Sequence, residues 1–365
     1  MYADLAKRLR NSIHEGGFRP GELLGSEHGL ARSHNISRVT VRRASEMLIQ
    51  EGLLERRPGK GLYVRDHRTP SAPHGRSAQT PTVIQVVAGN LSWDPSMLMS
   101  RGIQAIAREK AAQVQLYDAH GQVDLDLQMI RQLPDGPARG AVIISLHSAA
   151  FSEEVCRLKV SGFPFVLADQ RMRDLDVPSV VADNIEGGRL ATRHLLDLGH
   201  RRIAFIGDLV AATVQDRLAG MRDAMGDAGL PFNRSLVLDV TTGDDRLADW
   251  SACVTSMSHE LLGRADRPTA VFASCDAVAR AVYRAAADKG LSVPRDLSIV
   301  GFDDDSLAGW LNPGLTTVRQ PFEAMGRAAM ALLLSVMEDS DATIEHRVLP
   351  VELVVRGSTA APPGD

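Results

Sequence analysis

The stretch from residue 20 to residue 64 constrains this chain most, because it reads as two short helices, a turn and a hairpin. Ser26 is placed to cap a first helix over Glu27–Ser33, with an acidic residue at the positive end of the helix dipole. Ser37 is placed to cap a second helix that runs to about Glu51. Residues 1–15 are amphipathic and predict a preceding helix that completes a small core.

The second helix of this stretch separates apolar from basic side chains. Val41, Ala44 and Leu48 share one face, at the spacing of a core-facing stripe. Arg38 and Arg42 lie four residues apart on another face, near the helix start. A helix that enters the major groove by its N-terminal residues needs this layout, because the arginine fork can bond guanine or a phosphate. The alternative is a small helical domain with a solvated arginine face.

A hairpin is expected to follow this helix. Strands over 54–56 and 62–64 flank a basic tip, in which glycines permit close approach to a DNA backbone and Lys60 adds charge. The pattern therefore predicts a DNA-binding module in the first 66 residues.

Residues 1–66 resemble the GntR-type winged helix-turn-helix along their whole length. The matching residues are Pro20-Gly21, Ser26-Glu27, Leu30-Ala31, Ile36-Ser37-Arg38, Thr40-Val41-Arg42, Ala44, Leu48, Glu51-Gly52-Leu53 and Gly59-Lys60-Gly61. The resemblance implies DNA contacts from Ser37, Arg38, Thr40 and Arg42 on the recognition helix, and from Gly59 and Lys60 on the wing. Gly25 stands where the family usually has proline. His28, a further candidate DNA contact, stands where the family usually has arginine.

The charge of the chain is unevenly distributed. The formal net charge is -4 over 365 residues, but residues 1–68 carry 13 Lys and Arg against 8 Asp and Glu. A basic N-terminal part followed by an acidic remainder is typical of a nucleic-acid-binding domain joined to a domain that does not bind nucleic acid. The three cysteines are odd in number and widely spaced, so neither a disulfide framework nor a metal site is expected. With no long apolar run and a charged N-terminal helix, we expect no membrane partner and a place in the cytoplasm, on DNA.

A polar segment rich in proline and serine, residues 67–81, is expected to be a flexible linker. Beyond it, short apolar runs alternate with amphipathic helices, which favours parallel sheets covered on both faces. The fold class expected is α/β: the small winged head followed by two doubly wound parallel lobes. The strands expected are 83–88, 114–117, 141–145, 165–168, 203–207, 236–240, 270–273 and 299–302. The helices expected between them are 96–110, 123–133, 153–160, 187–198, 216–228, 247–262 and 277–289.

Residues 82–357 resemble the effector-binding core of LacI/GalR-type repressors, which has the periplasmic-binding-protein-like fold of type I. The matching residues include 162–166, Asp183-Asn184, Gly187-Gly188, 194–196, 198–207, 217–220, 268–270, 293–304 and 315–321. The resemblance implies three crossings between the lobes, which we place near 170, 302 and 322. One lobe would then combine 82–169 with 303–321, the other 170–302 with 322–357, and 358–365 would be a disordered tail.

A polyhydroxyl ligand needs charged groups that can bond neighbouring hydroxyls, and such groups follow several predicted strands. Asp169, Arg217, Asp276 and Asp303 lie at these ends and match effector-contact positions of the family. The alternatives are helix capping for Asp276, an interlobe salt bridge for Arg217 and hinge structure for the other two.

Weaker effector candidates come from loops and from one departure from the family pattern. Asn90, Trp93 and Asp94 stand where the family has a different segment, and His147 follows another strand. Cys275 replaces a usual asparagine, so the site loses an amide and the ligand cannot be carried over. Trp250 and Trp310 could stack on a sugar, but the core is the expected place for both.

These patterns predict a homodimeric repressor that binds a pseudo-palindromic operator and responds to a sugar-like effector, without a cofactor. The architecture matches that of the arabinose-responsive repressors. A transaminase-like enzyme would need a buried lysine, and only Lys110, Lys159 and Lys289 follow the head. A solute-binding transport protein would share the fold of the body but would need export.

Overall fold

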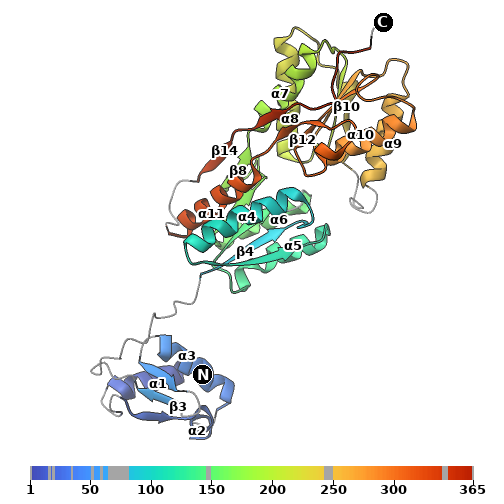
Figure 1. The fold of residues 1–365 in the computed structure, drawn as a ribbon. Helices are drawn as coiled ribbons and strands as arrows, with labels where there is room; N and C mark the ends of the chain where they lie inside the picture. The colour runs from blue at the N-terminus through green and yellow to red at the C-terminus, as the bar shows by residue number, and fades with distance from the viewer. Residues whose placement is uncertain are drawn as a thin grey trace. The chain divides into compact units, whose positions relative to one another are not determined.

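In a computed structural model of the chain, contacts divide the molecule into two units, Met1–Gln79 and Thr80–Asp365 (Figure 1). The structure describes residues 2–14, 18, 21–33, 36–50, 53–57, 61–64, 82–144, 149–241, 250–338 and 344–363. The expected linker, the wing residues Gly59 and Lys60, and His147 lie outside these ranges.

The first unit, the head, has three helices and a small antiparallel sheet among its described residues. The helices are α1 (Tyr2–His14), α2 (Glu27–Ser33) and α3 (Arg38–Gln50), and the strands are β1 (Leu23–Gly25), β2 (Leu54–Arg57) and β3 (Gly61–Val64). The sheet has the order β1-β3-β2, so β1 adds a strand that the sequence pattern did not indicate. Gly61 has φ +112°, and a Cβ there would lie 2.9 Å from the carbonyl oxygen of Gly25, so close pairing of β1 with β3 requires glycine.

Both predicted helix caps of the head are present. The Gly29 N–H donates to Ser26 Oγ at 3.0 Å, and the Thr40 N–H donates to Ser37 Oγ at 3.2 Å. The predicted stripe Val41, Ala44 and Leu48 is fully buried in the core of the head. Local sequence signals therefore placed these elements correctly.

The described residues of the second unit, the core module, form two six-stranded sheets. The first sheet has the order β14-β8-β7-β6-β4-β5 and is parallel throughout. Its strands are β4 (Val83–Ala88), β5 (Gln113–Asp118), β6 (Gly140–Ile144), β7 (Phe165–Ala168), β8 (Ser179–Ala182) and β14 (His346–Leu349). Helices α4 (Asp94–Glu109) and α11 (Phe322–Glu338) cover one face, and α5 (Val123–Gln132) and α6 (Ala149–Ser161) cover the other.

The second sheet has the order β10-β9-β11-β12-β13-β15, in which only the last pair is antiparallel. Its strands are β9 (Ile203–Gly207), β10 (Val237–Asp239), β11 (Ala270–Ala273), β12 (Ser298–Asp303), β13 (Thr316–Arg319) and β15 (Glu352–Val354). Helices α7 (Asn184–Asp197) and α8 (Ala212–Asp227) cover one face, and α9 (Trp250–Leu262) and α10 (Asp276–Asp288) the other. Three short 3-10 turns are Leu133–Asp135, Arg234–Leu236 and Ala308–Trp310.

Glycine contacts hold the central helix pair of each lobe close together. A Cβ on Gly102 of α4 would lie 2.0 Å from the carbonyl oxygen of Glu323 on α11. In the same way, a Cβ on Gly188 of α7 would lie 2.0 Å from the carbonyl oxygen of Arg217 on α8. Any side chain at these glycines would therefore push the helices apart.

The predicted division into lobes is wrong in part. Strand β13 pairs with β12, so 303–321 stays in the second lobe, while α11 packs on α4 in the first. Among the described residues, those within 82–182 and 322–349 form the first lobe, and those within 184–319 and 352–363 form the second. The chain therefore crosses near 183, 320 and 350, because strand pairing between distant segments, not the local pattern, decides lobe membership.

The predicted disordered tail is also wrong for residues 358–363. Ser358 is fully buried, donates to the carbonyl oxygen of Ile299 at 2.6 Å and accepts the Thr316 N–H at 2.7 Å. The carbonyl oxygen of Ala360 lies 2.9 Å from Nε2 of the buried His200. These hydrogen bonds attach the C-terminal segment to β12, β13 and His200 of the second lobe.

None of the helices in the described ranges combines the length and the apolar character that a membrane span requires.

Candidate functional site

The head presents its polar helix start away from its core. Ser37 and Arg42 are exposed, Thr40 is partly exposed, and the Ser37 and Thr40 hydroxyls lie 2.8 Å apart. The side chains of Arg38 and His28 are outside the described part of the structure. The described residues of α3 thus have the two-faced arrangement that a recognition helix needs, and the individual DNA contacts remain predictions.

The core module gathers its candidate effector residues at the carboxyl ends of strands from both lobes. Asp169 follows β7 in the first lobe. In the second lobe, Asp276 follows β11 at the start of α10, Asp303 ends β12, and Arg217 projects from α8. In open α/β sheets this is the edge at which ligands bind.

Arg217 is the central cation of this group. It is only 4% exposed, and its Nε donates to Asn184 Oδ1 at 2.8 Å while its Nη1 donates to the carbonyl oxygen of Ser274 at 2.5 Å. Its guanidinium carbon lies 3.8 Å from the centroid of the Phe302 ring. Nη1 also lies 3.8 Å from Asp303 Oδ1, so the cation is locked in place beside a carboxylate.

Asp303 has an unusual backbone and a shifted pKa. Its φ is +112°, and that of Asp304 is +55°, a left-handed conformation that costs about 1–3 kcal/mol per residue and clusters at functional sites. Gln320, at a lobe crossing, donates from Nε2 to Asp303 Oδ1 at 2.8 Å. Burial raises the pKa of Asp303 to about 6, although Arg217 and the Gln320 hydrogen bond act in the opposite direction.

Asp169 carries an oxygen that is enclosed but not bonded. Its φ is +59°, and no donor among the described residues reaches its buried Oδ1. Burial raises the pKa of Asp169 to about 7, Arg217 lowers it and Asp303 raises it. These influences place Asp169 of one lobe within electrostatic reach of two residues of the other.

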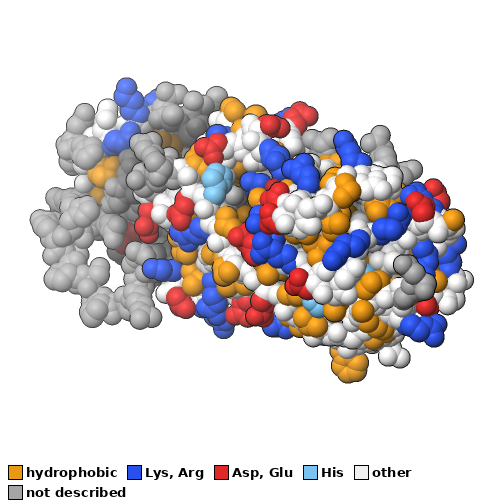
Figure 2. Space-filling view, turned by 90° about the horizontal axis from the view of Figure 1, so that it is seen from above, with side chains coloured by type: hydrophobic (Ala, Val, Ile, Leu, Met, Phe, Trp, Pro, Cys, Tyr) orange, Lys and Arg blue, Asp and Glu red, His pale blue; other side chains and the backbone are white. Residues whose placement is uncertain are grey.

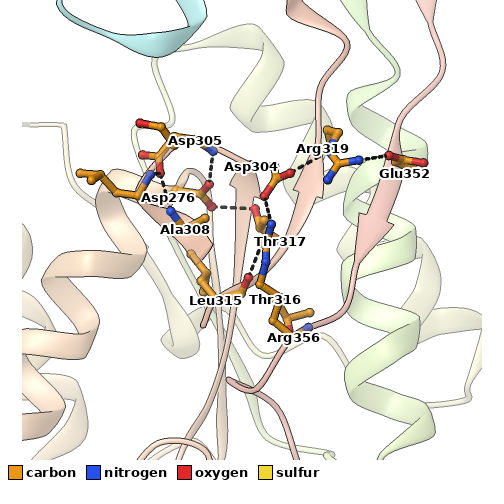
Figure 3. Close-up of polar contacts among 12 residues, drawn as sticks. Asp276, Asp304, Asp305, Ala308, Leu315, Thr316, Thr317, Arg319, Glu352 and Arg356 are labelled. Atoms are coloured by element: carbon orange, nitrogen blue, oxygen red, sulfur yellow. Dashed lines mark hydrogen bonds and ion pairs between the residues drawn. The ribbon is translucent and has the colours of Figure 1, made fainter. Parts of the chain in front are cut away.

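Asp276 is tied to the protein through both carboxylate oxygens (Figure 3). Thr317 donates its hydroxyl to Oδ1 at 2.6 Å, and the Asp305 N–H donates to Oδ2 at 2.8 Å. Burial, followed by the charge of Asp303, raises the pKa of Asp276 to about 8. Neither donor belongs to α10, so these contacts do not support the helix-capping alternative considered for Asp276. Effector contact of Asp276 remains a prediction.

Cys275 precedes α10 and provides no side-chain cap. Burial and the neighbouring Asp303 raise the pKa of its thiol to about 12, so the side chain is neutral at physiological pH.

A polar network at the carboxyl ends of β12 and β13 was not found from the sequence (Figure 3). Asp304 accepts from Arg319 Nε at 2.7 Å and from Arg356 Nη2 at 2.6 Å, and Arg319 also bonds Glu352. Arg319 directly precedes one crossing and Glu352 directly follows another. Three residues of the site lie next to crossings between the lobes: Asn184, Arg319 and Gln320. Correct positions for the crossings in the sequence analysis would therefore have indicated these residues as candidates.

The weaker effector candidates from the loops have different environments. Asp94 Oδ2 accepts the Ser306 N–H from the other lobe at 2.5 Å. Asn90 Oδ1 accepts the Ser92 N–H at 2.9 Å, which is a local turn, and Trp93 is 47% exposed. Trp310 is 86% exposed, so its expected place in the core is wrong. In the described part of the chain, no cluster of three His, Cys, Asp or Glu residues could hold a metal.

Comparison with known proteins agrees with this two-part architecture. Residues 1–64 match the family model for bacterial regulatory proteins of the gntR family, and residues 192–359 match the periplasmic binding protein-like domain. The arabinose metabolism transcriptional repressor of Geobacillus stearothermophilus is 29% identical over 364 residues, 98% of this chain and 97% of that protein. The HTH-type transcriptional regulator MalR of Streptomyces coelicolor is 35% identical over 246 residues, 65% of this chain and 69% of that one.

Among solved structures, the core resembles a LacI family transcriptional regulator from Enterococcus faecium with bound ribose. The TM-score is 0.62 at 28% identity, over 76% of this chain and 99% of that chain. Sequence, fold and relatives thus agree with the predicted fold class and with regulation of transcription. The chain belongs to the transcriptional regulators that join a GntR-family DNA-binding head to a LacI-type, periplasmic-binding-protein-like core.

Proposed function

We propose that this regulator is a homodimeric repressor in the cytoplasm. Its heads bind a pseudo-palindromic operator through α3 and the wing, and its clefts bind a sugar or sugar derivative. The effector alters DNA affinity because it binds one arrangement of the two lobes better than the other. The relative named for arabinose metabolism and the neighbour with bound ribose support sugars as the effector class.

One observation carries the effector assignment. Two carboxyl groups, those of Asp303 and Asp169, lie within electrostatic reach of the Arg217 guanidinium, and Asp303 Oδ1 is 3.8 Å from its Nη1. Carboxylate acceptors beside a fixed guanidinium donor can bond neighbouring hydroxyls of a sugar. The enclosed Oδ1 of Asp169, for which no described residue supplies a donor, favours a ligand hydroxyl as its partner.

The distribution of charge favours the head as the DNA-binding unit. On the face of the molecule drawn in Figure 2, Lys and Arg side chains are interspersed with Asp and Glu side chains. A DNA-binding surface would instead require a continuous basic patch. The excess of Lys and Arg over Asp and Glu in the first 68 residues favours the head.

We further propose that the chain is not an enzyme. A Schiff-base lysine must be buried to have a lowered pKa, and Lys110, Lys159 and Lys289 are exposed. Lys159 instead donates to the carbonyl oxygen of Asp176 at 2.7 Å.

A binding titration tests the proposal. Fluorescence anisotropy of full-length protein with duplex DNA from its own promoter region would be measured at several salt concentrations, with and without L-arabinose and D-ribose. Affinity should fall steeply with salt, because phosphate contacts release counterions, and one sugar should shift the affinity. Salt-independent binding, or affinity unchanged by any of a panel of sugars, would overturn the proposal.

A further inference from the structure

A buried ion pair joins the two lobes at a place that no sequence motif indicates. Asp216 on α8 is 5% exposed and accepts from Arg171 Nη2 at 2.6 Å and from Arg173 Nη2 at 2.8 Å. Both arginines are partly exposed, with side-chain exposures of 36% and 48%. We name these three residues the interlobe clasp.

The clasp joins the two lobes, because its members come from both of them. Arg171 and Arg173 lie between β7 and β8, two strands of the first sheet. Asp216 lies on α8, which packs against the second sheet. Any opening of the lobes that separates these segments must break both hydrogen bonds and leave the nearly buried Asp216 carboxylate without them.

The clasp is adjacent to candidate effector residues on both sides. Asp169 precedes Arg171 by two residues, and Arg217 directly follows Asp216. Asp169 and Arg217 come from opposite lobes, and the pKa of Asp169 responds to the charge of Arg217. The clasp therefore holds the distance between a carboxylate and a guanidinium that a bound hydroxyl compound would contact together.

We propose that Asp216, Arg171 and Arg173 are positioning residues that stabilise the closed lobes and so set effector affinity without contacting the effector. If the lobes are already closed before the effector binds, less of the binding free energy is used to close them. The observed effector affinity therefore rises with the fraction of molecules whose lobes are closed. The effector part of this proposal depends on the proposed function, because it requires a ligand in the cleft.

Five full-length variants test the clasp, one of which combines Asp216→Asn with the double arginine variant. Asp216→Asn removes the charge, Asp216→Glu retains it, and Arg171→Gln/Arg173→Gln removes the partners. The matched control is Asp223→Asn, on the same helix, where the carboxylate pairs with Arg189 at 3.2 Å within one lobe. Two quantities are measured: calorimetric affinity for L-arabinose and D-ribose, and hydrogen exchange of segments 169–178 and 212–220 without sugar.

We expect Asp216→Asn to weaken binding of the cognate sugar about tenfold, which corresponds to about 1.4 kcal/mol. It should also accelerate exchange in both segments. The arginine double variant should do the same, and combining it with Asp216→Asn should add little, because all three side chains form one unit. Asp216→Glu should restore most of the affinity, and Asp223→Asn should change neither measurement.

If hydrogen exchange in both segments is unchanged in Asp216→Asn, the clasp does not stabilise the closed lobes and the proposal is overturned. If exchange becomes faster but sugar affinity is unchanged, the clasp does not set effector affinity and the proposal is likewise overturned. If Asp216→Asn does not fold, the double variant at the two partly exposed arginines decides by the same measurements. If wild type binds neither sugar, the proposed sugar class fails, whereas the exchange data still decide whether the clasp closes the lobes.

Discussion

Replacing Asp169 by Asn should stabilise the core module at pH 8, and by less at pH 5. Between pH 3.8, the ordinary pKa of the carboxyl, and its raised pKa of about 7, Asp169 holds a proton in the folded protein but not in the unfolded chain. A group with this shift contributes stability at low pH, and that contribution is lost as the pH rises through the folded pKa. Asparagine does not titrate, so the variant avoids the loss.

The magnitude follows from the size of the shift. Raising the pKa from 3.8 to about 7 corresponds to about 4 kcal/mol, at about 1.4 kcal/mol for each pH unit. Since the residue is partly exposed at the cleft, water reduces this penalty, and we expect about 2 kcal/mol. The unpartnered Oδ1 gives the physical reason: the ionised carboxylate is desolvated without a compensating donor.

Urea unfolding followed by tryptophan fluorescence measures this difference. All three tryptophans, Trp93, Trp250 and Trp310, lie in the core module, so the signal does not report the head. The gain in the free energy of unfolding should grow from pH 5 to pH 8, and the exposed Asp223→Asn should change it by less than about 1 kcal/mol at either pH. A variant that is no more stable than wild type at pH 8, or whose difference does not change with pH, would refute the reasoning.

Three further substitutions test the head, the cleft and the helix packing. Arg42→Ala should weaken operator binding by about 1–3 kcal/mol in an anisotropy titration while leaving calorimetric sugar binding unchanged, and full operator affinity would remove Arg42 from the interface. Arg217→Ala should abolish the thermal stabilisation given by the cognate sugar and cost the core about 3–5 kcal/mol in urea unfolding, since buried carboxylates lose their cation; a retained thermal shift would contradict this. Gly188→Ala should cost at least about 1–3 kcal/mol because its Cβ would meet the carbonyl oxygen of Arg217 at 2.0 Å. Gly226→Ala on α8 is the control, since its Cβ would meet nothing within 4 Å, and equal costs for the two would refute the packing explanation.

Sequence reasoning succeeded where the signal was local. The caps at Ser26 and Ser37 and the buried stripe of α3 follow from spacing of a few residues. Strands β4, β7, β9 and β11 have the predicted bounds because continuous apolar runs mark buried parallel strands. The same reasoning missed β8, β13, β14 and β15, which are only three or four residues long. It also missed α11.

Which residues share the cleft edge was only partly accessible from sequence. Strand ends indicated Asp169, Arg217, Asp276 and Asp303 as candidates, since carboxyl ends of parallel strands meet at one edge. The roles of Asn184 and Gln320 as their hydrogen-bond partners depend on contacts across 33 and 17 residues. No local period encodes such contacts.

The sequence by itself determined that a basic winged head precedes a doubly wound α/β body, because capping, helix spacing and apolar strand runs act over a few residues. Only the tertiary structure decided which lobe holds β13 and α11, that residues 358–363 are anchored, and that Asp216 meets two arginines from the other lobe. These features depend on pairing and charge contacts between segments far apart in the chain. Their energies exist only when the folded backbone brings those segments together.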